Sequence, residues 1–433
     1  DKPRAMAEAE EGNAMIAEES GTTEQAEAQE APAEVTADGL AHSAEDGTAT
    51  LQQEHAEQAA PAEDPLWTAC KLAPWDFDSW MALISMIERG GDSSAIKDGY
   101  ENLLKEFPLC YGYWEKYARL EGRESGKEAQ MAIFDRGIAA VPCVELWNMY
   151  CTAMLEYVHA AGEDESAKLE AEASVREVFD RALASVGLYW GAGSLWDMCV
   201  KFEEERPESS DPNRTALLCL RAATTPCDFA ERYFTKLMGL FDNAPDDMLT
   251  VAADALPEDL RATIKGEGDA RKAPIRAAVK KLHDKAKAAA SKKQPFEDKI
   301  TRPYFHVKPL DAEQRDNWRA YTEAMVQQGD RAEAVRVFER CIIACNMYLD
   351  FWVQYASYLE GLDDYEGARQ VLTRGATGPF KRRTDLKLQL AFVEEMSGQY
   401  DAARAIYEEL PASPPSSMDV ALKYVNFEPR AAA

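Results

Sequence analysis

The stretch YGYWEKYARLE, residues 111–121, places aromatic and charged side chains at the spacing of one helix face. Trp114, Tyr117 and Glu121 stand at positions i, i+3 and i+7, so they lie on the same side of an α-helix. The aromatic side chains predict that this side packs against a second helix. A carboxylate among them needs a cationic partner, because an unpaired charge is costly to bury.

The same pattern recurs along the chain with a period near 34 residues. The gaps between successive anchors are 34, 33, 49, 122, 34, 35 and 34, so five of the seven lie within one residue of 34. A fixed period of this length is typical of repeats built from two helices. The anchors are Trp80, Trp114, Trp147, Trp196, Trp318 and Trp352, followed by Lys387 and Ala421 in two helical segments that lack the tryptophan.

A second helical segment follows each anchor, with small residues early, an apolar centre and then an arginine. Pro108, Pro142 and Pro226 close units, as expected where a helix must stop. The alternation typical of strands is nearly absent. The sequence therefore predicts an all-α solenoid of helical hairpins. The gap of 49 contains the extra residues 160–173, which predict either a longer helix or a loop between helices.

The arginine lies 22 residues after its tryptophan at Arg136, Arg340 and Arg374. A guanidinium at this constant offset is well placed to meet a carboxylate of the first helix, and its fork can bind both carboxylate oxygens. We therefore expect Glu121 to pair with Arg136, and Glu360 to pair with Arg374, inside their own hairpins. Trp352 and Tyr355 repeat the aromatic pair of the opening stretch beside the second of these contacts.

The unit of Trp318 departs from this rule, because Met325 stands where the glutamate is expected. Arg340 must therefore have another partner. In the regular units, loss of Arg136 should cost about 3 kcal/mol or more if Glu121 is left buried and alone.

The charge of the chain is unevenly distributed. The 433 residues carry a net charge of −29, of which residues 1–64 contribute −15. That first segment has no aromatic residue, so it cannot bury enough apolar surface to offset its chain entropy. We expect residues 1–64 to be a disordered acidic tail. A length of 433 residues is too great for one ordinary core, which favours two or three domains or an extended repeat array.

Nine cysteines are scattered along the chain without a C-x-x-C pair. Cys341 and Cys345 are one helical turn apart in an apolar segment, and two ligands without a third are weak evidence for a metal. This usage favours a reducing compartment, the cytosol or the nucleus. No secretory segment is recognised, and no apolar run is long enough to span a bilayer, so we expect no membrane partner.

A basic stretch interrupts the repeats. Residues 261–293 carry a charge of +8, and residues 275–293 predict a helix. One interpretation is contact with RNA or with an acidic peptide. The other is a solvated linker helix, since charge runs are usually solvated and no aromatic residues are interleaved for base stacking. The candidate contact residues are Lys280, Lys281, Lys285, Lys287, Lys292 and Lys293.

The sequence contains none of the common catalytic motifs. It has five histidines and no phosphate-binding glycine loop, G-x-S-x-G or H-E-x-x-H motif. The glycine-rich residues 187–194 lie between helices and follow no predicted strand. We therefore expect no enzyme and no cofactor.

Aromatic 34-residue helical pairs with Trp, Tyr and Glu in the first helix and Arg in the second resemble HAT (half-a-TPR) repeats. Residues 106–121 (EFPLCYGYWEKYARLE), 302–321 (RPYFHVKPLDAEQRDNWRAY) and 337–360 (VFERCIIACNMYLDFWVQYASYLE) closely resemble the pre-mRNA-processing factor 39 family. The resemblance covers roughly residues 66–428. RPYFHVKPL is its most specific part, because it does not belong to the generic repeat.

The resemblance implies an α-α superhelical solenoid of HAT repeats in two arrays. We expect an acidic tail at 1–64, an N-terminal array at 65–226, a helical linker at 227–300 and a C-terminal array at 301–433. The last unit ends after one helix, so Phe427 is expected to face solvent or a missing neighbour. The family places its dimer contact in later repeats, so a homodimer or a heterodimer with a related HAT protein stays open.

The function implied by the resemblance is a nuclear scaffold of the U1 small nuclear ribonucleoprotein that supports recognition of the 5′ splice site. Its partners would be U1 proteins, including the U1 C protein and the tail of the U1 70-kDa protein. Two alternatives remain open: a HAT scaffold of mRNA 3′-end cleavage, and direct RNA binding through residues 261–293.

Overall fold

The computed structural model describes residues 64–162, 164–206, 211–410 and 418–431. These residues form helices, turns and bends, and none of them belongs to a β-strand. The all-α fold predicted from the sequence is therefore confirmed. The predicted acidic tail lies outside the described residues except for Asp64, and the predicted boundaries between the four parts stay a prediction.

The chain divides into two compact units, residues 1–83 and 84–433. In the first unit, the described residues contain α2 (Pro65–Leu72) and the beginning of α3 (Phe77–Gly90). Trp67 packs edge-on against Trp80 with 6.4 Å between the ring centroids. The indole of Trp80 also donates a hydrogen bond of 3.1 Å to the carbonyl of Pro74.

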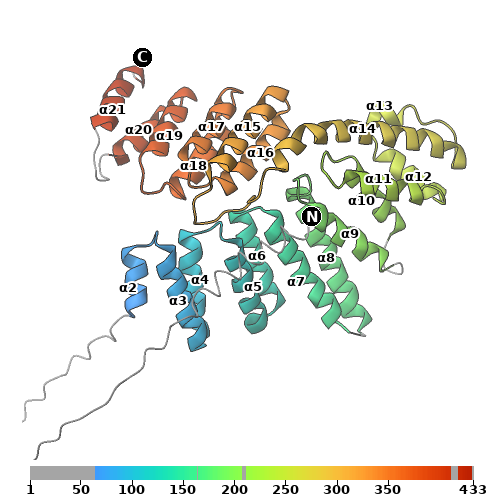
Figure 1. The fold of residues 1–433 in the computed structure, drawn as a ribbon, viewed down its shortest axis with the longest axis horizontal. Helices are drawn as coiled ribbons and strands as arrows, with labels where there is room; N and C mark the ends of the chain where they lie inside the picture. The colour runs from blue at the N-terminus through green and yellow to red at the C-terminus, as the bar shows by residue number, and fades with distance from the viewer. Residues whose placement is uncertain (1–63, 163, 207–210, 411–417, 432–433) are drawn as a thin grey trace, which may run out of the picture. The chain divides into compact units, whose positions relative to one another are not determined.

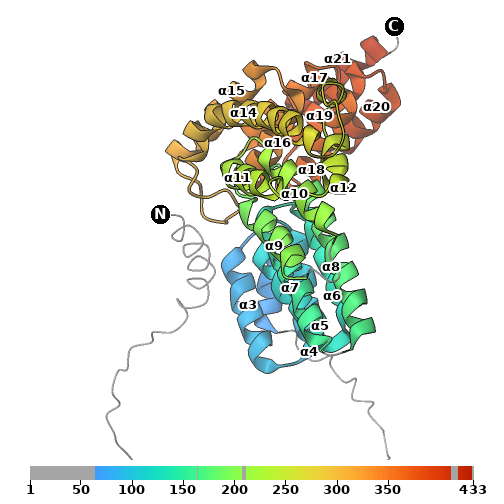
Figure 2. The same ribbon diagram turned by 90° about the vertical axis from the view of Figure 1, so that its right-hand side faces the viewer.

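Much of the second unit is built from antiparallel helical hairpins. The hairpins α5–α6 and α7–α8 lie side by side, as do α15–α16, α17–α18 and α19–α20 (Figure 1). Figure 2 shows the same helices from the side. The helices are α4 (Ser93–Glu106), α5 (Tyr111–Ser125), α6 (Lys127–Ala140), α7 (Val144–Ala160), α8 (Glu165–Ser185), α9 (Gly193–Glu204), α10 (Pro212–Ala223), α11 (Ala230–Leu240), α12 (Asp246–Asp254), α13 (Glu258–Arg261), the 3₁₀ helix η1 (Gly268–Arg271), α14 (Lys272–Glu297), α15 (Ala312–Gln328), α16 (Arg331–Ala344), α17 (Leu349–Glu360), α18 (Tyr365–Thr377), α19 (Asp385–Met396), α20 (Tyr400–Glu409) and α21 (Met418–Ala431).

The ends of the helices follow from local chemistry. Helices α4 and α6 each end two residues before a proline, Pro108 and Pro142, because proline disfavours the helical conformation of the residue before it. The carboxylates of Asp330 and Asp364 cap α16 and α18 by accepting backbone N–H groups of the first turn. The extra residues 160–173 lengthen a helix, since α8 has 21 residues.

Two glycines of second helices let a tryptophan approach the backbone closely. A Cβ atom at Gly137 would lie 2.9 Å from the Trp114 ring, and one at Gly375 would lie 3.0 Å from the Trp352 ring. Each glycine directly follows the recurring arginine of its helix. Glycine is unfavourable inside a helix, so we infer that the gain is the tight contact with the indole.

Residue Phe427 is buried, and the expectation that it faces solvent or a missing neighbour is wrong. Its ring lies 5.2 Å from that of Tyr407 in α20 and also contacts Tyr424, while the Arg404 guanidinium lies 5.7 Å from it. The side of α21 that carries Phe427 therefore packs on α20 and completes a core there.

Candidate interaction surfaces

The tryptophan anchors are core residues. All six are buried, so none of them offers its ring to a partner. In Trp80, Trp114 and Trp352 the indole N–H donates to the carbonyl of the residue six positions earlier, and in Trp196 it donates to Gly187. The indole N–H groups of Trp147 and Trp318 have no acceptor among the described residues. In these four units the hydrogen bond ties the start of the first helix to the turn before it.

The recurring arginine pairs with a glutamate of the preceding repeat, so the expected pairing inside each hairpin is wrong. Arg136 in α6 donates two hydrogen bonds of 2.7 Å to Glu101 in α4. Arg374 in α18 donates bonds of 2.7 and 2.9 Å to Glu339 in α16. Both contacts join the second helices of neighbouring hairpins. The arginine therefore holds one repeat to the next.

A tyrosine of the intervening first helix completes each of these contacts. The Tyr117 hydroxyl donates to Glu101 at 2.8 Å, and the Tyr355 hydroxyl donates to Glu339 at 2.9 Å. We call each set of three side chains an inter-repeat triad. The triads are Glu101–Tyr117–Arg136, Glu339–Tyr355–Arg374 and Glu297–Tyr321–Arg340.

The third triad explains how Arg340 is satisfied in the unit that lacks the glutamate. Its partner is Glu297 at the end of α14, which also accepts a 2.7 Å hydrogen bond from Tyr321. The side chains of Arg340 and Glu297 are only 13% and 2% exposed, against 48% and 41% for Arg136 and Glu101. The exposed ion pair of Arg136 and Glu101 therefore contributes about 1 kcal/mol or less to stability. Loss of Arg340 would instead leave the buried carboxylate of Glu297 without its cation, which is far more costly.

Glu121 and Glu360, which we expected to pair with Arg136 and Arg374, do not contact these arginines. Glu121 forms an ion pair of 2.9 Å with Lys97 of α4. Glu360 has no ion pair among the described residues, and burial raises the pKa of its carboxyl group. In contrast, the Arg136 guanidinium lowers the pKa of Glu101, against the opposing effect of partial burial.

A buried ionic network joins α8, α9 and α10, and the sequence pattern gave no indication of it. The Glu203 carboxylate accepts hydrogen bonds from Arg176 at 3.1 Å and from Arg214 at 2.7 Å. Arg206 forms a second pair with the buried Glu172 at 3.3 Å. The guanidinium groups of Arg176 and Arg206 both lie over the ring of Phe202, at 5.3 and 4.1 Å. Asp180 accepts a third contact, from Arg214 at 2.8 Å, so three carboxylates balance the three guanidinium groups, and two of them, Glu172 and Glu203, are buried.

The six candidate lysines of α14 fall into three groups. Lys293 is buried and pairs with Glu333 at 2.9 Å, so the prediction that it contacts RNA is wrong. Lys280 pairs with Asp284, and Lys287 pairs with Glu231. The third group has no carboxylate partner among the described residues and is exposed: Lys281, Lys285 and Lys292.

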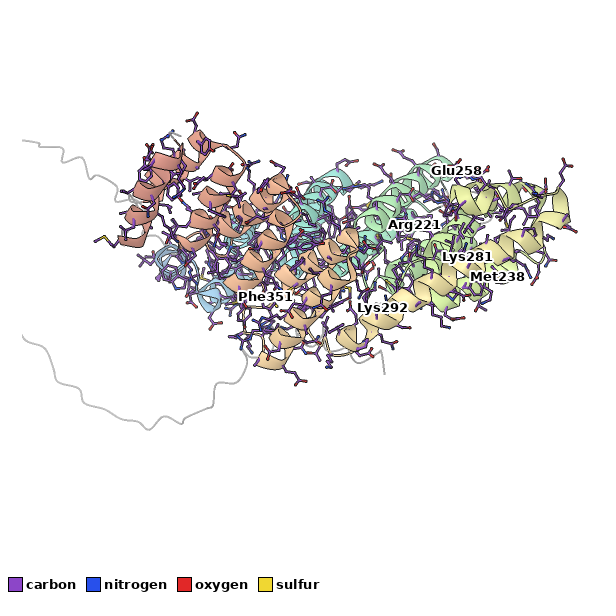
Figure 3. All side chains as sticks on the ribbon, turned by 90° about the horizontal axis from the view of Figure 1, so that it is seen from above. Arg221, Met238, Glu258, Lys281, Lys292 and Phe351 are labelled. Carbon is purple, nitrogen blue, oxygen red and sulfur yellow. The ribbon has the colours of Figure 1, made fainter. Side chains whose placement is uncertain are left out.

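These three lysines lie on one face of α14. Their positions i, i+4 and i+11 fall within a narrow angular sector of an α-helix. Figure 3 labels Lys281 and Lys292, the two ends of the row. The row is the part of the predicted basic surface that the fold leaves available to an anion.

A groove of about 540 Å³ lies between the second helices α16 and α18. Its apolar lining includes Val335, Leu359 and Val371, and its charged lining includes Arg331 and Arg369. Arg331 pairs with Asp364, and Arg369 pairs with Glu394. The groove therefore combines an apolar surface with guanidinium groups that are already neutralised.

Neither a metal site nor a membrane helix is found in the part of the chain that the structure describes. These residues hold no cluster of three or more His, Cys, Asp or Glu side chains that could bind a metal ion. None of the described helices is both long and apolar enough to cross a bilayer.

Comparison with known proteins assigns both halves of the chain to one family. The family model of the PRP39 N-terminal HAT repeat matches residues 64–238, and that of the PRP39 C-terminal HAT repeat matches residues 291–430. The pre-mRNA-processing factor 39 of Schizosaccharomyces pombe is 30% identical over 389 residues, which cover 82% of this chain and 61% of that protein. The pre-mRNA-processing factor 39 of Homo sapiens is 28% identical over 375 residues, 80% of this chain and 55% of that protein.

A relative that is named for mRNA 3′-end processing matches less well. The mRNA 3′-end-processing protein rna14 of S. pombe is 22% identical over 355 residues, which cover 78% of this chain and 45% of that protein. The chain therefore spans about half to three fifths of the length of these curated relatives.

Proposed function

Because the chain belongs to the PRP39 family of HAT-repeat proteins, we propose that it acts in the nucleus as a non-enzymatic scaffold of pre-mRNA splicing. The match of both repeat families, one in each half of the chain, is the observation that carries this proposal. The finer form of the proposal is that the chain binds U1 small nuclear ribonucleoprotein proteins, namely the U1 C protein and the tail of the U1 70-kDa protein. In that role it would support recognition of the 5′ splice site.

The inter-repeat triads support a scaffold role on physical grounds. Two of the triads tie the second helix of one hairpin to the second helix of the next through a bidentate guanidinium contact, and the third ties α16 to α14 in the same way. Repeats held in this way present a surface that needs little ordering when a partner binds. Stacked repeats of this kind typically bind extended segments of other proteins.

A pull-down from nuclear extract, with and without ribonuclease, tests the proposed partners. We expect U1 proteins to be retained after ribonuclease treatment, because a protein scaffold contacts them directly. Complete loss of U1 proteins would favour tethering through RNA. Recovery of cleavage-factor subunits in place of U1 proteins would favour a role in mRNA 3′-end processing, which the similarity to rna14 keeps as an alternative.

The lysine row of α14 supports direct RNA binding as a second candidate function. Lys281, Lys285 and Lys292 are exposed without a carboxylate partner among the described residues, so their charges are available to phosphate groups. We expect reversal of all three charges to Glu to weaken binding of single-stranded RNA at least tenfold at low salt. Fluorescence anisotropy across a salt series measures this change.

A matched variant separates the row from the rest of α14. Reversal of Lys280 and Lys287, which are already paired with carboxylates, should weaken binding less. Unchanged RNA affinity after reversal of the three unpaired lysines would remove this candidate.

A further inference from the structure

The turn between α4 and α5 contacts two loops from the C-terminal half of the second unit. Before the turn, Glu106 accepts hydrogen bonds from Lys381 at 2.7 Å and from Arg382 at 3.2 Å. After the turn, the ring of Tyr111 meets that of Tyr304 edge-on, with 6.0 Å between centroids. Figure 1 shows the ends of α4 and α5 that flank this turn close to α18. Glu106 and Lys381, which are 275 residues apart in the sequence, are thus joined at this turn.

These two contacts differ in chemistry. Tyr111 and Tyr304 bury aromatic surface, and burial raises the pKa of the Tyr111 hydroxyl. The cationic side of the ionic contact is open to solvent, since Lys381 and Arg382 are 30% and 46% exposed, whereas Glu106 is 15% exposed. Ion pairs that solvent reaches are weakened by salt, so an outside carboxylate can compete with Glu106 for the two cations.

The loop between α18 and α19 contains three consecutive basic residues in a protein of net charge −29. Arg383 pairs with Asp385 beside it, whereas Lys381 and Arg382 share the distant carboxylate of Glu106. The burial of Glu106 would raise the pKa of its carboxyl group, but the two cations outweigh burial and lower the pKa. A carboxylate is therefore a ligand that fits between these two side chains.

We propose that Glu106, Lys381 and Arg382 form a latch, and that an acidic segment of a partner protein opens it by taking the place of Glu106. A peptide is favoured over RNA because the position is filled by a carboxylate and the neighbouring Phe380 is buried beneath Arg383, unavailable for base stacking. The proposal does not depend on the role in splicing.

Carbodiimide coupling tests the latch, because this reagent joins a carboxylate and an amine only when the two groups touch. In the full chain we expect a Glu106–Lys381 amide, detected by peptide mass spectrometry. The Glu121–Lys97 pair, with a similar separation of 2.9 Å between the consecutive helices α5 and α4, provides the matched link. A short poly-glutamate peptide should remove the first link, couple to Lys381 itself and leave the second link unchanged.

Variants give an independent measurement. Glu106→Gln should raise the affinity for poly-glutamate roughly two- to fivefold, the factor that an exposed ion pair is worth. Glu124→Gln should leave the affinity unchanged, because Glu124 pairs with Lys97 and Ser93 of the adjacent helix α4 and does not contact Lys381 or Arg382. Lys381→Glu combined with Arg382→Glu should abolish binding of the peptide.

Three results would overturn the proposal. The first is absence of the Glu106–Lys381 link in the free protein. The second is persistence of that link at saturating poly-glutamate. The third is its displacement by oligouridylate but not by the peptide, which would assign the surface to RNA.

Discussion

Replacement of Arg340 by Ala is expected to lower the free energy of unfolding of the C-terminal repeats by about 3–5 kcal/mol. The change leaves the Glu297 carboxylate 2% exposed with only the Tyr321 hydroxyl to satisfy it. It also removes the guanidinium that lies 5.7 Å from the Trp318 ring. Denaturant unfolding, combined with amide hydrogen exchange of α15 and α16, measures the loss.

The same substitution in an exposed triad is the control. Arg136→Ala removes an arginine in the same position of its repeat, but its contact with Glu101 is nearly half exposed. We expect a loss of about 1 kcal/mol or less there. The double variant Glu297→Ala, Arg340→Ala should cost less than the sum of its single changes, since no unpaired charge remains. Equal losses for Arg340→Ala and Arg136→Ala would contradict the importance of burial.

Replacement of Glu203 by Gln is expected to cost about 3 kcal/mol in the N-terminal repeats. The carboxylate is 1% exposed and is shared by Arg176 and Arg214. A neutral amide cannot balance these guanidinium groups, and its own N–H₂ group would face cations. The midpoint of thermal unfolding and hydrogen exchange of α8, α9 and α10 report the effect.

A nearby glutamate provides the comparison for this change. Glu205 lies two residues later, is 55% exposed, and pairs with Lys201 at 3.5 Å and only at 3.9 Å with Arg206. Glu205→Gln should change stability by less than about 0.5 kcal/mol. If Glu203→Gln were as mild, the network would not contribute to the stability of these helices.

The repeat could be predicted because its signals are local. A tryptophan that recurs every 34 residues, the 3.6-residue periodicity around it and the prolines that end α4 and α6 each act within one or two helices. The family resemblance of residues 302–321 is also a property of consecutive residues. These features gave the all-α fold, the core positions of the six tryptophans and the family that the comparisons then showed.

The partners of the arginines could not be predicted in the same way. Glu121 precedes Arg136 by 15 residues and Glu101 precedes it by 35, and both offsets are compatible with a hairpin repeat. The sequence signal that could have identified the correct partner is a glutamate 35 residues before the arginine, because Glu339 and Arg374 are separated by the same number of residues. Arg340 breaks even this rule, since its glutamate lies 43 residues earlier, at the end of α14.

The lysines of α14 show the same division between local and tertiary information. Their positions on a helix follow from the sequence, but the neutralisation of Lys287 and the burial of Lys293 depend on Glu231 and Glu333, which come from other helices. Only packing distinguishes these two lysines from Lys281, Lys285 and Lys292.

The sequence by itself determined that this chain is a stack of paired helices with indole rings in its core, because helix formation and burial depend on residues that are close along the chain. The tertiary structure alone decided which carboxylate each cation meets, at Glu101, at Glu297 and at Glu106. Such contacts depend on how one hairpin is rotated and shifted against the next, and a difference of one helical turn changes every partner.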